Sequence, residues 1–249
     1  MTPVAHQLHL DSQPMMSRLI RWLEVSPKTK TPRPCGDEVV LSGRNPSQMG
    51  WYGFLADVVE GQSVLDVGCG SGEGLRVLTG RATVALGIDL DERLQRSDVN
   101  VEIRSVTDIP AKSFDVVVCL DVIEHVEADH AFIAELFRVA RKAVFVSTPN
   151  YSVSFNRHPY HIREYTPYEF ARLFDGYGDV TLFGGSAKGF ERVRISRPRA
   201  YALVGALYRW RPTILAAKVL KRVLRLTMWK HHAALVRLDA SGSSSAAAA

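Results

Sequence analysis

The feature of this sequence that most constrains its fold is a regular alternation of apolar runs and helical patterns between residues 63 and 149. Continuous apolar runs such as DVVVCL and AVFVST are typical of parallel strands that are covered on both faces. Because such strands alternate with helices, the sequence predicts an α/β fold built on a doubly wound, mostly parallel sheet. Ligands bind at the carboxyl ends of the strands in these sheets, so functional residues are expected there.

The individual elements follow from the same patterns. Strands are predicted over residues 63–67, 82–89, 100–106, 113–120 and 143–149. Helices are predicted over residues 45–61, 72–80, 90–96 and 129–142. Gly61 is placed to end the first of these helices.

Length and composition fit one well-buried domain with appendages, since the 249 residues are 46% hydrophobic and 23% charged. We expect an N-terminal helical lid over residues 1–45, a ligand-binding domain over 46–196, a basic helical appendage over 197–238 and a disordered tail over 239–249. The sequence shows neither a basic leader nor eighteen consecutive apolar residues, so a cytoplasmic location is expected. Three cysteines without CxxC spacing favour a reducing compartment.

Charge is concentrated near the C-terminus. Residues 197–237 contain ten Lys or Arg and no Asp or Glu, whereas the net charge of the whole chain is +5. Four of these cations recur at helical spacing opposite apolar residues and predict a basic amphipathic helix: Lys218, Lys221, Arg222 and Arg225. Such a helix could pack on the domain, bind an anionic membrane surface as a peripheral protein, or bind nucleic acid. We favour the membrane over nucleic acid because no pattern of interleaved aromatic and basic residues on a sheet is evident.

A glycine-rich turn follows the first predicted strand, in the segment SVLDVGCGSGEG. Gly68, Gly70 and Gly72 allow a tight turn and a close approach of the backbone to a ligand. Asp89 lies 21 residues after Gly68, where a carboxylate can accept hydrogen bonds from both ribose hydroxyls of a nucleoside. Glu73 occupies the position where a dinucleotide fingerprint needs a third small residue, so a dinucleotide is disfavoured.

These segments, VLDVGCGSG, GIDLDE, VTDIP and FDVVVCLDVIEHV, resemble the successive signatures of class I S-adenosylmethionine-dependent methyltransferases, over about residues 47 to 174. The resemblance implies a Rossmann-like S-adenosylmethionine-binding domain over residues 46–196. It implies that Asp66 and the loop Gly68, Cys69, Gly70 and Gly72 hold the methionine part of the cofactor, that Asp89 with Leu90 holds the ribose, that Asp108 and Ile109 flank the adenine, and that Leu120 contacts the cofactor.

The segment CLDVIEHVEADH places titratable residues at the end of a core strand. Methyl transfer from a sulfonium requires alignment of the reactants and removal of a proton from the acceptor, and we predict His125, His161 and Glu124 as catalytic residues. A second hypothesis is that Asp121, Glu124, His125 and His161 bind Mg²⁺ or Mn²⁺, which would acidify an acceptor hydroxyl. In the alternative without metal, Asp121 caps the turn or contacts the cofactor, Glu124 accepts backbone hydrogen bonds and His125 is a hydrogen-bonded core histidine.

Two subfamilies resemble the DVIEHV segment: ubiquinone-biosynthesis O-methyltransferases and small-RNA 3′-terminal 2′-O-methyltransferases, both with an E-x-x-E-H metal set. This chain has Asp121 in place of the first Glu, and Gln48 where the quinone enzymes have an arginine for the cofactor carboxylate. It is therefore assigned to neither subfamily. The segment HPYHIREYT is similar to a histidine-containing stretch of the RNA enzymes, and a capping arrangement at Thr166, Pro167 and Glu169 predicts a helix after it, with His161 on the loop that faces the acceptor.

The sequence thus predicts an S-adenosylmethionine-dependent methyltransferase that transfers a methyl group to oxygen of a small or lipid-linked hydroxylated acceptor, such as a sugar or quinol. One alternative is an RNA ribose 2′-O-methyltransferase. The other is a non-catalytic cofactor-binding adaptor that docks through its basic C-terminal helix.

Overall fold

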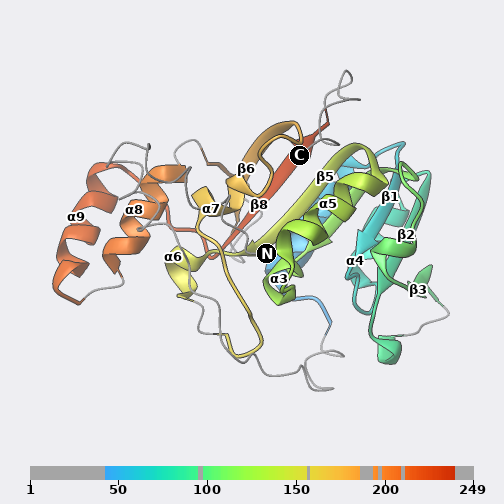
Figure 1. Cartoon of the computed structure of the whole chain (residues 1–249), viewed down its shortest axis with the longest axis horizontal. Helices are drawn as coiled ribbons and strands as arrows, with labels where there is room; N and C mark the ends of the chain where they lie inside the picture. The colour runs from blue at the N-terminus through green and yellow to red at the C-terminus, as the bar shows by residue number, and fades with distance from the viewer. Residues whose placement is uncertain are drawn as a thin grey trace, which may run out of the picture.

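The computed structural model describes residues 43–94, 98–155, 158–185, 193–195, 198–208 and 211–238. The predicted lid, apart from residues 43–45, and the predicted disordered tail lie outside these residues. An eight-stranded sheet in the order β3-β2-β1-β4-β5-β8-β6-β7 forms the centre of the described chain (Figure 1). This arrangement confirms the predicted α/β fold with a mostly parallel sheet.

Five consecutive parallel strands, from β3 to β5 in the sheet order, confirm the predicted strand pattern. The strands are β1 (Ser63–Val67), β2 (Val84–Asp89), β3 (Val101–Ile103), β4 (Phe114–Leu120), β5 (Ala140–Pro149), β6 (Asp179–Gly185), β7 (Val193–Arg194) and β8 (His231–Arg237). Continuous apolar runs in the central strands bury side chains on both faces of the sheet, which gives two hydrophobic clusters. In β4, Val117 and Cys119 enter one cluster, whereas Val116 and Val118 enter the other.

The helices cover both faces of the sheet. They are α3 (Pro46–Val58), α4 (Glu73–Thr79), α5 (Asp129–Val139), α6 (Tyr151–Ser154), α7 (Pro167–Arg172), α8 (Pro198–Tyr208) and α9 (Ile214–Val223), with 3-10 turns η1 (Glu92–Leu94), η2 (Val106–Asp108), η3 (Ile123–His125) and η4 (Arg211–Thr213). The predicted capping of α7 is confirmed, since the Thr166 side chain accepts from the Glu169 amide and the Glu169 carboxylate accepts from the Thr166 amide. The first predicted helix ends at Val58 instead of at Gly61, and among the described residues of the predicted helix over 90–96 only a 3-10 turn forms. The predicted helix over 129–142 is three residues too long, because β5 begins directly at Ala140.

The predicted boundary between domain and appendage at residue 196 is wrong. Strand β8 lies between β5 and β6 and pairs with both in the antiparallel sense, so residues 231–237 belong to the central sheet. The basic segment is an insertion of two helices, α8 and α9, between β7 and β8. The predicted basic helix is also shorter than its sequence pattern, because Arg225 follows it in a left-handed conformation with φ of 51°. None of the described helices is long and apolar enough to cross a membrane.

Gly74 allows α4 to approach α3 closely. A Cβ atom at this position would overlap the ring of Tyr52, which is fully buried and donates a hydrogen bond to Asp66 over 2.7 Å. We expect Gly74→Ala to lower the free energy of unfolding by about 2 kcal/mol, because overpacking of a rigid ring outweighs the better helix propensity of alanine. Urea denaturation monitored by circular dichroism measures the change.

Gly53 in α3 is the matched control, since a Cβ there has no neighbour within 4 Å. We expect Gly53→Ala to raise the free energy of unfolding by up to about 1 kcal/mol. Equal urea midpoints for the two variants would show that Tyr52 can move without cost.

Candidate active site

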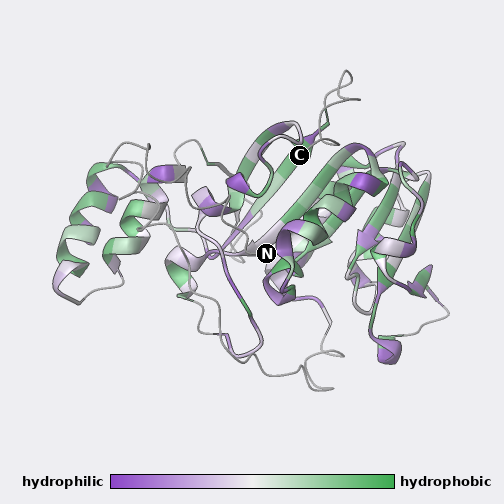
Figure 2. Cartoon of the chain, in the orientation of Figure 1, coloured by the Kyte–Doolittle hydropathy of each residue, from purple (hydrophilic) through white to green (hydrophobic). Residues whose placement is uncertain are grey.

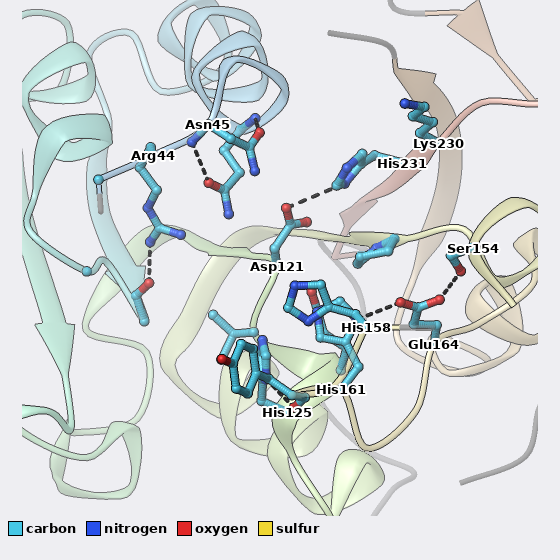
Figure 3. Close-up of a pocket in the computed structure, with 18 of the residues that line it drawn as sticks. Arg44, Asn45, Asp121, His125, Ser154, His158, His161, Glu164, Lys230 and His231 are labelled. Carbon is cyan, nitrogen blue, oxygen red and sulfur yellow. Dashed lines mark hydrogen bonds and ion pairs between the residues drawn. The ribbon is translucent and has the colours of Figure 1, made fainter. Parts of the chain in front are cut away.

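A cavity of about 1000 Å³ opens at the carboxyl ends of the parallel strands (Figure 3). Residues that end or follow β1, β2, β4 and β5 line it, and His231 at the start of β8 joins them. This is the location that the doubly wound topology predicts for a ligand. The volume is at the upper end of the range for small-molecule sites, so it can accommodate a cofactor together with an acceptor.

The glycine loop forms one side of the cavity. Gly68, Gly70 and Gly72 all have positive φ, at 71°, 58° and 76°, which side chains other than glycine adopt rarely. A Cβ at Gly68 would overlap the Val122 side chain, so only glycine allows the two strand ends to approach this closely. The loop therefore presents bare backbone to the cavity, as predicted for Gly68 and Gly70, which both line it.

Asp89 ties the loop to the end of β2. Its Oδ2 accepts a hydrogen bond from the Gly70 amide at 2.9 Å, and its Oδ1 accepts from the Leu90 amide at 2.8 Å. The carboxylate lines the cavity beside Asp91 and Leu94, in the place predicted for a ribose ligand. The predicted partner Leu90 is exposed to solvent and does not line the cavity.

Several predicted cofactor residues are not part of the cavity wall. Asp66 is fully buried behind the loop. Desolvation raises its pKa to about 6, although the positive charge of Arg44 acts to lower it. Cys69 and Leu120 are buried in the core. Ile109 packs in the same cluster as α5, and Asp108 is exposed on the turn η2. Gly72 caps α4. Contacts of these six residues with a cofactor stay predictions.

Arg44 was not predicted as a site residue, but it lines the cavity together with the glycine loop. Its guanidinium donates to the carbonyl of Gly68 and, over 3.3 Å, to the carbonyl of Leu120, so it links the ends of β1 and β4. Its Nε is buried and has no hydrogen-bond partner among the described residues. Gln48, four residues later, also lines the cavity. No local sequence pattern indicates Arg44, because it precedes the first predicted helix and lies in the predicted lid.

Glu124 lies on the opposite side, in the turn η3 after β4. Its carboxylate is buried, and Oε2 accepts a hydrogen bond from Thr148 Oγ1 at 3.1 Å, whereas Oε1 has no partner among the described residues. Desolvation and then the charge of Asp121 raise its pKa well above the ordinary value. The amides of Ile162 and Arg163 donate to the Glu124 carbonyl, which fixes the loop before α7 against this turn.

His125 and His161 both line the cavity, and in each ring Nδ1 lies next to an oxygen of the protein. His125 Nδ1 lies 3.0 Å from the carbonyl of Tyr160, and His161 Nδ1 lies 2.5 Å from Oε1 of Glu164. Because a carbonyl and a carboxylate only accept, Nδ1 carries the proton in both rings and Nε2 remains as an acceptor when the ring is neutral. The ring centroids are 4.9 Å apart. The structure therefore brings together Glu124, His125 and His161, as predicted.

Asp121 does not join this cluster. It adopts φ of 53°, accepts a hydrogen bond from Ser147 Oγ at 2.7 Å and forms an ion pair with His231 Nδ1 at 3.5 Å (Figure 3). Burial raises the pKa of Asp121, but the charge of His231 and the hydrogen bond from Ser147 outweigh it and leave a value of about 2. The predicted four-residue metal set is thus wrong at Asp121, because the left-handed turn directs this carboxylate to β8. His231 was missed, since β8 was not predicted.

A divalent cation fits the remaining three residues. Their ligand atoms lie within 4.8 Å of one another, and the unpartnered Oε1 of Glu124 needs a proton or a cation to offset its burial. Two imidazole nitrogens and one carboxylate are a donor set that suits several divalent ions. Glu164, held by the Ser154 hydroxyl, would fix the orientation of His161 from behind.

The parallel sheet, the glycine loop at its first strand and the carboxylate at the end of its second strand define a class I S-adenosylmethionine-dependent methyltransferase. The cavity has room for an acceptor beside the cofactor. The chain belongs to the methyltransferase domain family, which matches residues 19–199.

Individual relatives agree with this assignment. A probable S-adenosylmethionine-dependent methyltransferase of Mycolicibacterium smegmatis is 35% identical over 143 residues, which cover 51% of this chain and 55% of that protein. A ubiquinone biosynthesis O-methyltransferase of Pseudomonas fluorescens is 34% identical over 122 residues, which cover 43% of this chain and 52% of that protein. The chain spans about half the length of these curated relatives.

A solved S-adenosylmethionine-dependent methyltransferase of Archaeoglobus fulgidus has the same fold. It superposes with a TM-score of 0.53 at 17% sequence identity, covering 77% of this chain and 94% of that chain. At this identity the similarity supports the architecture alone.

Proposed function

We propose that this methyltransferase transfers the methyl group of S-adenosylmethionine to a hydroxyl of a small or lipid-linked acceptor, such as a sugar or quinol. One observation carries the proposal: the glycine loop and Asp89 share a single cavity with His125 and His161. A hydroxyl is a weak nucleophile until it loses its proton, so a site for O-methylation needs a proton acceptor near the methyl group. The similarity to a ubiquinone biosynthesis O-methyltransferase supports oxygen as the acceptor atom.

The two sides of the cavity have different tasks in this proposal. The bare backbone of Gly68 and Gly70 would hold the methionine part of the cofactor, and Asp89 would hold the ribose. The cofactor methyl group would then face the turn after β4, where the acceptor hydroxyl binds in line with the sulfur. Alignment and proton removal are the main contributions of the protein, because the sulfonium is already an activated donor.

Neutral imidazole is the form that can accept the proton. Desolvation and the neighbouring His161 ring lower the pKa of His125 below its ordinary value, so this ring is neutral at pH 7. Its Nδ1 proton is engaged by the Tyr160 carbonyl, which leaves Nε2 to take the proton of the acceptor. His161 is arranged in the same way by Glu164.

A metal-assisted variant of this chemistry uses the same residues. Glu124, His125 and His161 would hold a divalent ion such as Mg²⁺ or Mn²⁺, and that ion would lower the pKa of a bound hydroxyl. In that case the imidazoles act as ligands, and the proton leaves to another acceptor. Asp121 is not that acceptor, because its ion pair with His231 helps to hold its pKa at about 2.

Mass spectrometry of ligands that co-purify with the protein, combined with elemental analysis of metals, tests the proposal most directly. Purified protein is then incubated with S-adenosylmethionine labelled in its methyl group and with sugars, quinols, a total lipid extract or RNA. We expect label in a hydroxylated small molecule or lipid. Label in RNA alone would identify a ribose methyltransferase, and cofactor binding without any turnover would identify a non-catalytic adaptor.

Arg44 is expected to bind the cofactor carboxylate in place of the arginine that is absent at position 48. We predict that Arg44→Gln raises the Kd of S-adenosylhomocysteine about 10-fold or more, because a charge-assisted hydrogen bond in a buried site is lost. Isothermal titration calorimetry measures the affinity. Arg76→Gln is the control, since Arg76 is an exposed residue of α4 that pairs with Asp98. An unchanged Kd in Arg44→Gln would show that Arg44 links the strand ends but does not bind the cofactor.

A further inference from the structure

The inserted helices α8 and α9 form a distinct part of the molecule. In Figure 1 they lie at the end of the described chain opposite β3, beyond α6 and α7. Helix α8 packs against α6 and α7, and α9 packs against α8. None of the residues of α9 lines the cavity.

Helix α9 buries only one side. Ala217 is fully buried, and Leu220 and Leu224 are half-buried on the side that meets α8. Apolar residues are also exposed on this helix, and Figure 2 shows hydrophobic colour along much of it. Three of them, four residues apart, are largely exposed within the described chain: Leu215 at 72%, Val219 at 56% and Val223 at 71%.

An exposed apolar row of this kind is unusual for a surface helix. The solvent face of a helix in a globular protein is normally polar, and contiguous exposed apolar residues mark interaction sites. Leu203 of α8 is also exposed, at 40%. We call the row Leu215, Val219 and Val223 the α9 apolar row.

Cations border the α9 apolar row. Lys218 and Arg222 are exposed on α9, next to the row at helical spacing, and Arg225 is exposed just after the helix. The whole segment from residue 197 to 237 contains no Asp or Glu that could pair with them. Positive charge next to exposed aliphatic side chains is the composition of a helix that lies in the interface of an anionic bilayer.

We propose that the α9 apolar row and its flanking cations dock this methyltransferase on an anionic phospholipid surface. The aliphatic side chains would enter the region between headgroups and acyl chains, while Lys218 and Arg222 contact lipid phosphates. A nucleic acid would use the cations but would leave Leu215, Val219 and Val223 without an apolar partner, so the lipid surface accounts for more of the observed face.

Docking at α9 also places the acceptor side of the cavity near the lipid. Helix α6, against which α8 packs, carries Val153 and Ser154, and both line the cavity. Three helices in contact thus connect the proposed membrane face with the wall that faces the acceptor. This consequence rests on the proposed function, whereas the docking itself does not.

Co-sedimentation of the full chain with vesicles tests the docking without cofactor or acceptor. We expect sedimentation with vesicles of phosphatidylcholine that contain roughly 30% phosphatidylglycerol, weaker binding at high salt, and little binding to pure phosphatidylcholine. Lys218→Ser/Arg222→Ser should reduce partitioning at least about 10-fold, and Val219→Ser/Val223→Ser should reduce it by a comparable factor. These residues are exposed, so circular dichroism should show folded protein in both cases.

Matched controls lie at the other end of the sheet. Val84 is 53% exposed on β2, and Arg81, three residues earlier in the chain, is exposed and pairs with Glu60. Arg81→Ser/Val84→Ser should leave vesicle binding unchanged. The proposal is overturned if the wild-type protein stays in solution with anionic vesicles or if the α9 variants bind as well as the control. It is equally overturned if Val219→Ser/Val223→Ser binds vesicles as the wild type does but no longer self-associates or no longer binds RNA. None of these outcomes affects the methyl-transfer assay.

Discussion

Replacing His161 with alanine is expected to lower kcat for methyl transfer by about 10²-fold or more, with the Kd of S-adenosylmethionine changed by less than about twofold. The imidazole lines the cavity where we propose that the acceptor binds, and Glu164 orients it at 2.5 Å. Under the proposed function, its loss removes a proton acceptor or a metal ligand. The glycine loop and Asp89 remain in place. Steady-state kinetics with the acceptor found in the labelling experiment, together with calorimetry of cofactor binding, separate the two effects.

A matched control and a positioning variant sharpen this test. His130→Ala removes an exposed histidine at the start of α5, outside the cavity wall, and should leave kcat unchanged. Glu164→Gln keeps a hydrogen-bond acceptor for His161 Nδ1 but removes the charge, so we expect a smaller loss than in His161→Ala. If His161→Ala and His130→Ala turn over equally fast, His161 neither takes the proton nor binds a required metal.

The second large effect concerns stability at acidic pH. His232 in β8 is fully buried and stacks on Phe170 with ring centroids 4.6 Å apart, and neither of its ring nitrogens has a hydrogen-bond partner among the described residues. Desolvation, followed by repulsion from His231, lowers its pKa to about 3. The unfolded chain binds this proton near pH 6.5, whereas the folded chain does not. His232 therefore leaves the free energy of unfolding almost unchanged above about pH 6.5 and lowers it as the pH falls below this value.

Between pH 7 and pH 5, His232 should cost the folded state about 2 kcal/mol. In His232→Leu this loss disappears, because leucine fills a similar buried volume and does not titrate. Urea denaturation of both proteins at pH 7 and pH 5 measures the difference, which isolates His232 from the other titrating groups. His130→Ala, in which an exposed histidine is removed, should keep the wild-type dependence. Parallel pH profiles for His232→Leu and the wild type would contradict a neutral, desolvated ring.

Local patterns were sufficient for the parallel half of the sheet. In β4, the run of apolar residues from Val116 to Leu120 identifies a strand buried on both faces, and the following polar residues identify the strand end that lines the cavity. The glycines after β1 and Asp89 after β2 are equally local, since turn geometry and strand position fix where each side chain goes. The position of His161 on a loop that lines the cavity also followed from the strand end that precedes this loop.

The residues that the sequence did not identify come from distant parts of the chain. Strand β8 was missed because its side chains continue a basic segment, and nothing in HHAALVR indicates that it pairs with β5 and β6. Arg44 precedes the first regular helix, and its two carbonyl partners at Gly68 and Leu120 belong to separate strands. Such contacts depend on which elements become neighbours.

The sequence by itself determined the class of protein: a parallel α/β sheet whose first strands end in a glycine loop and a carboxylate, because these features arise from periodicity and turn chemistry over a few residues. Only the tertiary structure decided which partners the titratable residues after β4 contact. Glu124 and His125 turn toward His161, whereas Asp121 pairs with His231, which lies 110 residues further along the chain. The physical reason is long-range strand pairing, since the insertion of β8 beside β5 places His231 opposite Asp121.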